Sequence, residues 1–144
     1  MYTKINEKDS IMKLGAIYSK EKTTFTLFSP VADSVFVIFY DKGNDSTETG
    51  RLEMMRGEGE LRSIFSATAE GNLDGVYYTY EVHTADGTFS SHDPYARACG
   101  VNGHRSMVID LSKTDPDGFA DEDRPKLADP MSMVITEVSV ADVS

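Results

Sequence analysis

Residues 74–111 read DGVYYTYEVHTADGTFSSHDPYARACGVNGHRSMVIDL, and this stretch decides the fold. Apolar and polar side chains alternate along 76–83, which is the period of two residues that a half-buried strand shows. Asp86-Gly87 then supplies a two-residue turn, because glycine tolerates positive φ and aspartate accepts it locally. The chain returns through Phe89 and stops at Asp93-Pro94, since proline cannot donate a ladder hydrogen bond. The stretch therefore predicts a β-hairpin.

The remainder of the chain shows the same pattern of short strands and turns. Short segments of β-forming residues recur about every 8–12 residues, separated by turn residues, with almost no helical periodicity. Besides the hairpin, the predicted strands cover 14–18, 23–28, 34–40, 51–56, 61–69 and 107–111. The segment SVFVIFY is apolar on both faces, so we expect it at the centre of a sheet. The pattern predicts an all-β fold, an immunoglobulin-like antiparallel β-sandwich of about seven or eight strands.

Length and charge limit the classes of function. The chain has 144 residues, 40% hydrophobic and 26% charged, which is typical of one soluble globular domain. Its net charge is −10, from 24 acidic and 14 basic residues. Nucleic acids and anionic membranes are bound largely through Lys and Arg, so we expect neither as a partner. A neutral glycan is not disfavoured by this charge.

The N-terminus and the single cysteine add two expectations. The opening MYTKINEKDSIMKLG contains no apolar segment typical of a secretory signal, which favours a cytoplasmic protein, and its polar residues predict a flexible segment over 1–12. Cys99 is the only cysteine, so an internal disulfide and a thiolate zinc cluster are excluded. No histidine lies near it in the sequence, and we expect an ordinary buried thiol.

The texture changes after Leu111. Residues 112–131 are rich in proline and aspartate and are predicted to form a linker. Residues 133–143, MVITEVSVADV, then alternate like one more strand with strong β-propensity. An unpaired strand exposes N–H and C=O groups, so we expect this segment to pair with a sandwich edge, in its own or another copy, or to be disordered. Pairing between copies would favour self-association as a dimer.

Several motifs occur in the order seen in one known family. TFTLFSPVADSVFVIFYD covers 24–41, and GNLDGVYYTYEV covers 71–82. Asp-Pro-Tyr-Ala at 93–96 and Gly-Val-Asn-Gly at 100–103 form the most specific pair. From about residue 14 to the end, the chain resembles the N-terminal family 48 carbohydrate-binding module of type I pullulanases, bacterial enzymes that debranch α-glucans.

The resemblance implies a domain organisation. Residues 13–111 would be the β-sandwich module, 112–131 a linker, and 132–144 a remnant of the first strand of an absent (β/α)₈ catalytic barrel. Residues 134–143 keep the frame of that barrel strand but lose its bulky and charged side chains. The replacements are Thr136, Ser139, Ala141 and Val143, where pullulanases place Tyr, His, Arg and Phe. Natural divergence and a deliberate edit both account for these replacements.

The sequence predicts no catalysis, metal or cofactor in this chain. Glycoside hydrolysis requires two carboxyl groups held across a sugar bond, and in the resembled family they lie on later barrel strands. The acidic residues here occur mainly in loops, and the three histidines do not have the spacing of metal ligands. A glycine-rich phosphate loop is also absent from the sequence. The acidic residues are therefore interpreted as solvated surface.

Glycan binding is the chemistry that the resemblance leaves open. Starch-binding modules of this family use two Trp together with a Lys and an Asn, and this chain has no Trp. Alignment on the Asp-Gly turn places Phe89 at one Trp position and Thr79 at the Lys position. The loop over 41–50 offers no ring for the other position. Phe89 is thus the candidate glycan-binding residue, with cross-strand packing as the alternative, and a single ring predicts millimolar binding or weaker, about −4 kcal/mol.

Three hypotheses of function follow. The leading one is a non-catalytic module of a pullulanase-like α-1,6-glucan debranching enzyme that docks on the parent's catalytic barrel and binds α-glucan weakly, if at all. The first alternative is a functional starch- or glycogen-binding module. The second alternative is an engineered β-sandwich interaction scaffold, suggested by the replacements in the last segment.

Overall fold

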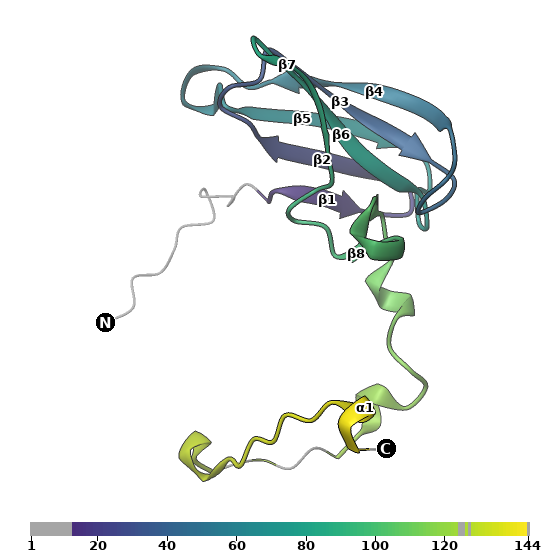
Figure 1. The fold of residues 1–144 in the computed structure, drawn as a ribbon, viewed down its shortest axis with the longest axis vertical. Coiled ribbons are helices and arrows are strands. Elements are labelled where there is room, and N and C mark those ends of the chain that lie inside the picture. The colour runs from purple at the N-terminus through teal and green to yellow at the C-terminus, as the bar shows by residue number, and fades with distance from the viewer. Residues whose placement is uncertain (1–12, 124–125, 127, 144) are drawn as a thin grey trace. The chain divides into compact units, whose positions relative to one another are not determined.

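The computed structural model describes residues 13–123, 126 and 128–143, so the flexible segment predicted over 1–12 lies outside the described residues. The chain divides into two units, Met1–Lys113 and Thr114–Ser144. All the strands of the described residues belong to the first unit (Figure 1). They are β1 (Gly15–Tyr18), β2 (Lys22–Phe28), β3 (Ser34–Tyr40), β4 (Glu48–Arg56), β5 (Ile64–Glu70), β6 (Tyr77–Thr84), β7 (Gly87–Ser91), β8 (Ala98–Cys99) and β9 (Ser106–Met107).

Every pairing between these strands is antiparallel, in the order β1-β2-β5-β4-β3-β6-β9-β8, with β7 paired to the same edge of β6 as β9. The sheet curls into two layers. One contains β1, β2 and β5, and the other contains β3, β6 and most of β4. The end of β4 joins the layers, because Met55 and Arg56 pair with β5. The predicted all-β antiparallel sandwich is confirmed, and β3 is central as expected.

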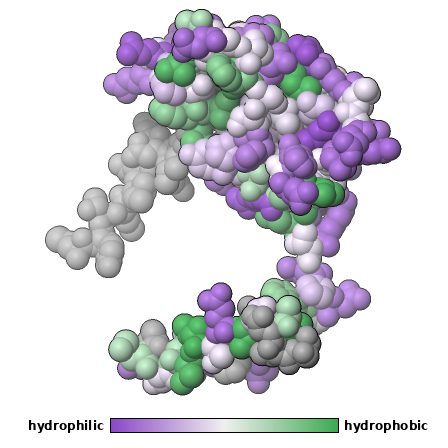
Figure 2. Space-filling model, viewed as in Figure 1, coloured by the Kyte–Doolittle hydropathy of each residue, from purple (hydrophilic) through white to green (hydrophobic). Residues whose placement is uncertain are grey.

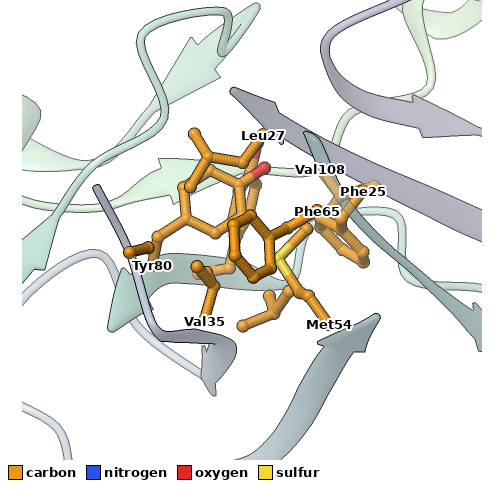
Figure 3. Close-up of a cluster of buried hydrophobic side chains, with 10 residues drawn as sticks. Phe25, Leu27, Val35, Met54, Phe65, Tyr80 and Val108 are labelled. Atoms are coloured by element: carbon orange, nitrogen blue, oxygen red, sulfur yellow. The ribbon is translucent and has the colours of Figure 1, made fainter. Parts of the chain in front are cut away.

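The core lies between the two layers (Figure 3). Phe25, Leu27 and Phe65 enter it from one layer, and Val35, Val37, Met54, Tyr78 and Tyr80 enter it from the other. Aromatic rings pack edge to face, with the centroids of Phe25 and Tyr78 5.0 Å apart. This geometry suits the ring quadrupoles and adds about 0.5–1.5 kcal/mol beyond burial. The alternating residues of the predicted strands supply this core, as their period of two requires.

A buried carboxylate anchors the end of the hairpin. Asp93 is 3% exposed, and its Oδ2 accepts hydrogen bonds from the hydroxyls of Tyr78 at 2.7 Å and Tyr80 at 3.2 Å. Its Oδ1 accepts the backbone N–H of Tyr95, and its own N–H donates to Ser106 Oγ. Burial, with the nearby Asp93 charge, raises the pKa of both tyrosines, so their hydroxyls stay protonated donors. The Asp-Pro-Tyr motif is therefore structural at this point.

Four predicted boundaries are corrected by the structure. The strand predicted over 51–56 begins at Glu48, so it takes in the end of the preceding loop. The hairpin turn falls on Ala85-Asp86, because Thr84 pairs with Gly87. The strand predicted over 61–69 begins at Ile64, since a 3₁₀ turn occupies Gly59–Leu61. The strand predicted over 107–111 is only Ser106–Met107, although Val108 still exchanges backbone hydrogen bonds with the segment before β6.

The second unit contains no strand among its described residues. The strand predicted over 133–143 is not formed: the backbone is irregular over 133–139, and a short helix α1 covers Val140–Val143. A strand is stabilised by hydrogen bonds to a neighbouring strand, and no described residue of the chain pairs with this segment as a strand. Val134 and Ile135 are 92% and 80% exposed, and Figure 2 shows hydrophobic residues on the surface of this unit. Self-association through 133–143 stays a prediction.

Among the described residues, no helix has both the length and the apolar character needed to cross a membrane.

Candidate functional site

A polar hollow of about 440 Å³ opens on the outer face of β3 and β6. It is lined by Tyr40, Asn44, Asp45, Thr79, Ser90, His104 and Arg105. Tyr40, Thr79 and Ser90 come from β3, β6 and β7, while the others come from the loop after β3 and the loop before β9. The hollow therefore combines strand residues with a rim of two loops.

The alternation of β6 positions the strand residues of the hollow. Tyr78 and Tyr80 face the core, so Thr79 between them faces outward. Thr79 is nevertheless only 5% exposed. Its Oγ1 lies 3.3 Å from the hydroxyl of Tyr40, at hydrogen-bond distance. The neighbouring strand β3 thus fixes the orientation of both hydroxyl groups.

Arg105 connects the two loops of the rim. Its guanidinium carbon lies 3.5 Å from the centroid of the Tyr40 ring, in a cation–π contact. One terminal nitrogen donates to the Lys42 carbonyl at 2.7 Å and to Ser46 Oγ at 2.8 Å, and the other donates to the Ser46 carbonyl at 2.8 Å. The side chain therefore covers one face of Tyr40 and holds the loop over 42–46 at the same time.

Two glycines allow the loops of the rim to touch. A Cβ on Gly100 would lie 2.5 Å from the Cα of Gly43, and a Cβ on Gly43 would lie 2.8 Å from the Cα of Gly100. Both contacts are with backbone, which cannot move aside as a flexible side chain would. In the Gly-Val-Asn-Gly motif, Asn102 and Gly103 also adopt positive φ, 54° and 70°. The motif thus serves a tight turn and a close backbone approach.

The lining favours hydrogen bonding. It offers hydroxyl, amide, carboxylate, imidazole and guanidinium groups, and one face of its tyrosine ring, that of Tyr40, is covered by Arg105. Such groups suit a neutral ligand with many hydroxyls, because each hydroxyl both donates and accepts. Stacking of the ligand on a flat ring is correspondingly reduced.

Phe89 and Thr79 are not brought together. Phe89 pairs with Val82, whose side chain packs against the core, so Phe89 lies on the opposite face of the hairpin from Thr79. Ser90 is the β7 residue that lines the hollow. Phe89 is 54% exposed, so its ring remains accessible at the edge of the sandwich. Its role as a sugar platform stays a prediction.

Sequence reasoning missed Tyr40 and Arg105, the two residues that shape the hollow. Tyr40 ends an apolar strand, which favours a core position, although the alternation from Val35 and Val37 places Tyr40 on the outer face. Arg105 follows the Gly-Val-Asn-Gly motif, but its contacts are with residues 59 and 63 positions away. No local pattern reports a contact of that range.

Cys99 is exposed, which corrects the expectation of a buried thiol. Its strand, β8, is only two residues long and forms the end of the sheet, so a neighbour covers one side alone. Across the part of the chain that the structure describes, no group of three or more His, Cys, Asp or Glu side chains is arranged to hold a metal ion.

A second cavity, of about 340 Å³, lies at the seam between β1 and residues 107–112. Apolar side chains such as Ala16, Ile17 and Met107 contribute to its lining. Near the seam, Tyr18 donates a hydrogen bond to Asn72, and Lys113 forms an ion pair with Asp74 at 2.6 Å. This cavity marks where the curled sheet does not close.

The outer face of β2 and β5 differs from the rest of the surface. Three of its four cross-strand pairs are uncharged: Thr24–Thr68, Thr26–Ser66 and Phe28–Ile64. The fourth, Lys22–Glu70 at the end of the strands, brings opposite charges together. Ile17 of β1 and Met55 of β4 extend the same face, and Phe28 and Met55 are 55% and 74% exposed. In a chain of net charge −10, a sheet face with charges only at its end and with exposed apolar side chains is typical of a surface that contacts another protein.

The family model of carbohydrate-binding module 48 (isoamylase N-terminal domain) matches residues 13–96. Pullulanase A of Streptococcus pneumoniae serotype 4 is 31% identical over 116 residues, which are 76% of this chain and 9% of the relative.

Two solved structures are also similar. The crystal structure of apo pullulanase from Paenibacillus barengoltzii superposes with a TM-score of 0.81 at 35% identity, covering 92% of this chain and 20% of that one. The same enzyme in complex with maltohexaose and α-cyclodextrin gives a TM-score of 0.75 at 34% identity, covering 82% of this chain and 18% of that one. The chain thus spans a fifth or less of the length of these relatives.

Proposed function

The chain belongs to the carbohydrate-binding module 48 family, and from that premise we propose that it is the non-catalytic N-terminal module of a pullulanase-like enzyme and binds α-glucan weakly in the hollow around Tyr40, Thr79 and Arg105. The observation that carries the proposal is the position of the hollow. Thr79 stands where the resemblance places the glucan-binding Lys, and it lies on the floor of a cavity whose polar groups suit sugar hydroxyls. A relative was solved with maltohexaose and α-cyclodextrin, which supports this class of ligand.

The same geometry predicts weak binding. Sugar rings are held strongly when they stack on flat aromatic faces, and the chain has no Trp, while Tyr40 is covered by Arg105 on one face. Hydrogen bonds to sugar hydroxyls replace hydrogen bonds to water, so each contributes only about 0.5–1.5 kcal/mol net. We therefore expect a millimolar dissociation constant, which corresponds to about −4 kcal/mol.

Native gels containing amylopectin or glycogen test where the glucan binds. The chain should be retarded, and a double variant of the rim, Asn44→Ala with His104→Ala, should migrate as it does in a gel without polysaccharide. Phe89→Ala is the matched control, because Phe89 is exposed but lies outside the hollow, and it should keep the retardation. Loss of retardation in Phe89→Ala alone would move the site to the hairpin edge and contradict the proposal.

Release of reducing ends from pullulan tests the non-catalytic assignment. The purified chain should release none above a matched blank, because glycoside hydrolysis requires a pair of carboxyl groups across the scissile bond. The acidic residue in the hollow, Asp45, comes from a loop and is the only Asp or Glu in its lining. Turnover above the blank would contradict the assignment.

Docking on a catalytic barrel is the second candidate, and the three uncharged cross-strand pairs on the outer face of β2 and β5 favour it. We propose that this face, which includes Thr24, Ser66 and Thr68, contacts the barrel of the parent enzyme. The chain should co-sediment with the Paenibacillus pullulanase from which the matching region has been removed. Ser66→Lys should abolish co-sedimentation, because a buried unpaired charge is costly, whereas Lys at the exposed Ser90 should not.

A further inference from the structure

Arg105 has more donors than the rim uses. A guanidinium carries five N–H donors in a rigid plane. Three hydrogen bonds join Arg105 to the Lys42 carbonyl, the Ser46 carbonyl and Ser46 Oγ. The side chain is half-buried and lines the hollow, beside Asn44 and His104. The guanidinium therefore stands between the ring of Tyr40 and any ligand that approaches that face of the ring.

The rim also limits how a polymer chain can enter. The loops over 42–46 and 100–105 are joined through Arg105 and through the backbone contact of Gly43 with Gly100. Both loops contribute lining residues, Asn44 and Asp45 from one and His104 and Arg105 from the other. A glucan that runs through a binding groove needs two open ends, whereas here two loops in contact with each other line one side of the hollow.

We propose that Arg105 determines the specificity of the hollow, which takes the free end of an α-glucan chain through hydrogen bonds from the guanidinium instead of stacking an internal stretch on Tyr40. This inference rests on the proposed glucan-binding function. It deepens that function by naming the part of the polymer that is bound. Arg105 touches the ligand and also holds the loop over 42–46, so its two effects need separate measurements.

Maltohexaose and α-cyclodextrin are the matched probes, because they contain the same number of α-1,4-linked glucose units and only the linear one has ends. Titration calorimetry or ligand-observed NMR with the full chain should show maltohexaose bound at least about tenfold more tightly than α-cyclodextrin. Arg105→Ala should weaken the binding of maltohexaose by about 10- to 100-fold, which is the effect expected for the loss of hydrogen bonds to a charged group. It should also bring the ratio of the two affinities close to one, because the covered face of Tyr40 is then open.

Arg105→Lys and Arg51→Ala are the controls. Lysine keeps the charge but not the planar fork of donors, so we expect an intermediate ratio. Arg51 also packs over an aromatic ring, Phe36, but lies outside the lining of the hollow, so Arg51→Ala should leave both affinities unchanged. Thermal unfolding of each variant reports whether the loops have loosened. Loosening alone would weaken the binding of both ligands by the same factor and leave the ratio of affinities unchanged.

The outcomes separate the two proposals. Wild-type binding of neither ligand overturns the proposed function and, with it, the role of Arg105. Equal affinity for the two ligands, or an unchanged ratio in a folded Arg105→Ala, overturns the specificity role while glucan binding stands. A preference for the linear ligand that disappears with Arg105 supports both.

Discussion

Single residues account for the two most specific motifs of the chain, because each motif contains a residue with a structural role that its side chain, or the lack of one in glycine, determines. Asp93 of Asp-Pro-Tyr-Ala is a buried acceptor for two tyrosine hydroxyls, and Gly100 of Gly-Val-Asn-Gly permits a backbone contact with Gly43. Both motifs are visible in the sequence as turn and loop signals. The residues that these motifs contact cannot be read from the sequence. The carboxylate accepts hydrogen bonds from residues 13 and 15 positions away, and the glycine contacts a residue in another loop.

Tyr78→Phe tests the buried carboxylate. Removing the hydroxyl takes away a donor 2.7 Å from Asp93 in a site that water does not reach, so the free energy of unfolding should fall by about 1.5–3 kcal/mol. Tyr95→Phe is the control, because that side chain is 52% exposed, and its change should stay within about 0.5 kcal/mol. Urea unfolding of the variants measures both values. Equal effects would contradict the role assigned to Asp93.

Gly100→Ala tests the contact between the rim loops. The new Cβ would lie 2.5 Å from the Cα of Gly43, so the backbone must shift, and we expect a loss of about 1–3 kcal/mol together with weaker glucan binding. Gly50→Ala provides the comparison, since the nearest atom to its Cβ, in the Phe39 ring, is 4.0 Å away. A Gly100→Ala variant as stable as Gly50→Ala would show that the loops are not in contact.

At the scale of elements, the positions of the strands were largely predictable, and their ends were less so. The apolar segment SVFVIFY predicted β3 at its observed bounds, because both its ends adjoin turn residues. The segment over 107–111 failed as a strand because β6 has only a short free edge left beside β7. The face on which Phe89 lies was predictable from residue numbers. A two-residue turn at 85–86 or at 86–87 pairs Phe89 with an even-numbered residue of β6, whereas Thr79 is odd-numbered and so lies on the opposite face.

The ion pair of Lys113 with Asp74 attaches the end of the first unit to the loop before β6. Hydrogen bonding from Lys113, and then from the Asp110 backbone, lowers the pKa of Asp74. A lowered pKa in the folded state contributes stability above the unfolded value, near pH 4, and that stability is lost as pH falls through the folded pKa. Asp74→Asn should therefore destabilise the chain at neutral pH, with a difference from wild type that shrinks in acid.

Urea unfolding across pH checks this prediction, with Asp86→Asn in the exposed turn as the control that should follow the wild-type curve. A difference between Asp74→Asn and wild type that stays constant down to acid pH would contradict the linkage.

Removal of the segment over 133–143 tests whether its exposed apolar residues drive assembly. Its exposed Val134, Ile135 and Val138 are apolar surface that a second copy can bury. A sheet edge that pairs with this segment on one copy is also present on the other, so the pairing can be reciprocal. We expect the full chain to sediment as a dimer and a version ending at Pro130 to sediment as a monomer. If both sediment as the same species, self-association through this segment should be dropped.

At the scale of the whole molecule, the fold class followed from the spacing of short β-forming segments, and the family followed from the order of motifs along the chain. The site did not, because the hollow is assembled from β3, β6, β7 and two loops that the curl of the sheet brings together. The absence of Trp was readable and still predicts weak binding. A cytoplasmic, bacterial setting, expected from the sequence, stays a prediction.

Mapping of backbone amide shifts during a titration with maltohexaose tests the central claim most directly, because millimolar binding in fast exchange still moves the signals of contacting residues. The account predicts that the largest shifts fall in the loops over 42–46 and 100–105 and at Thr79 and Ser90, with Phe89 and the outer face of β2 and β5 unmoved. Shifts centred on Phe89 and the hairpin edge, or none at saturating ligand, would contradict it.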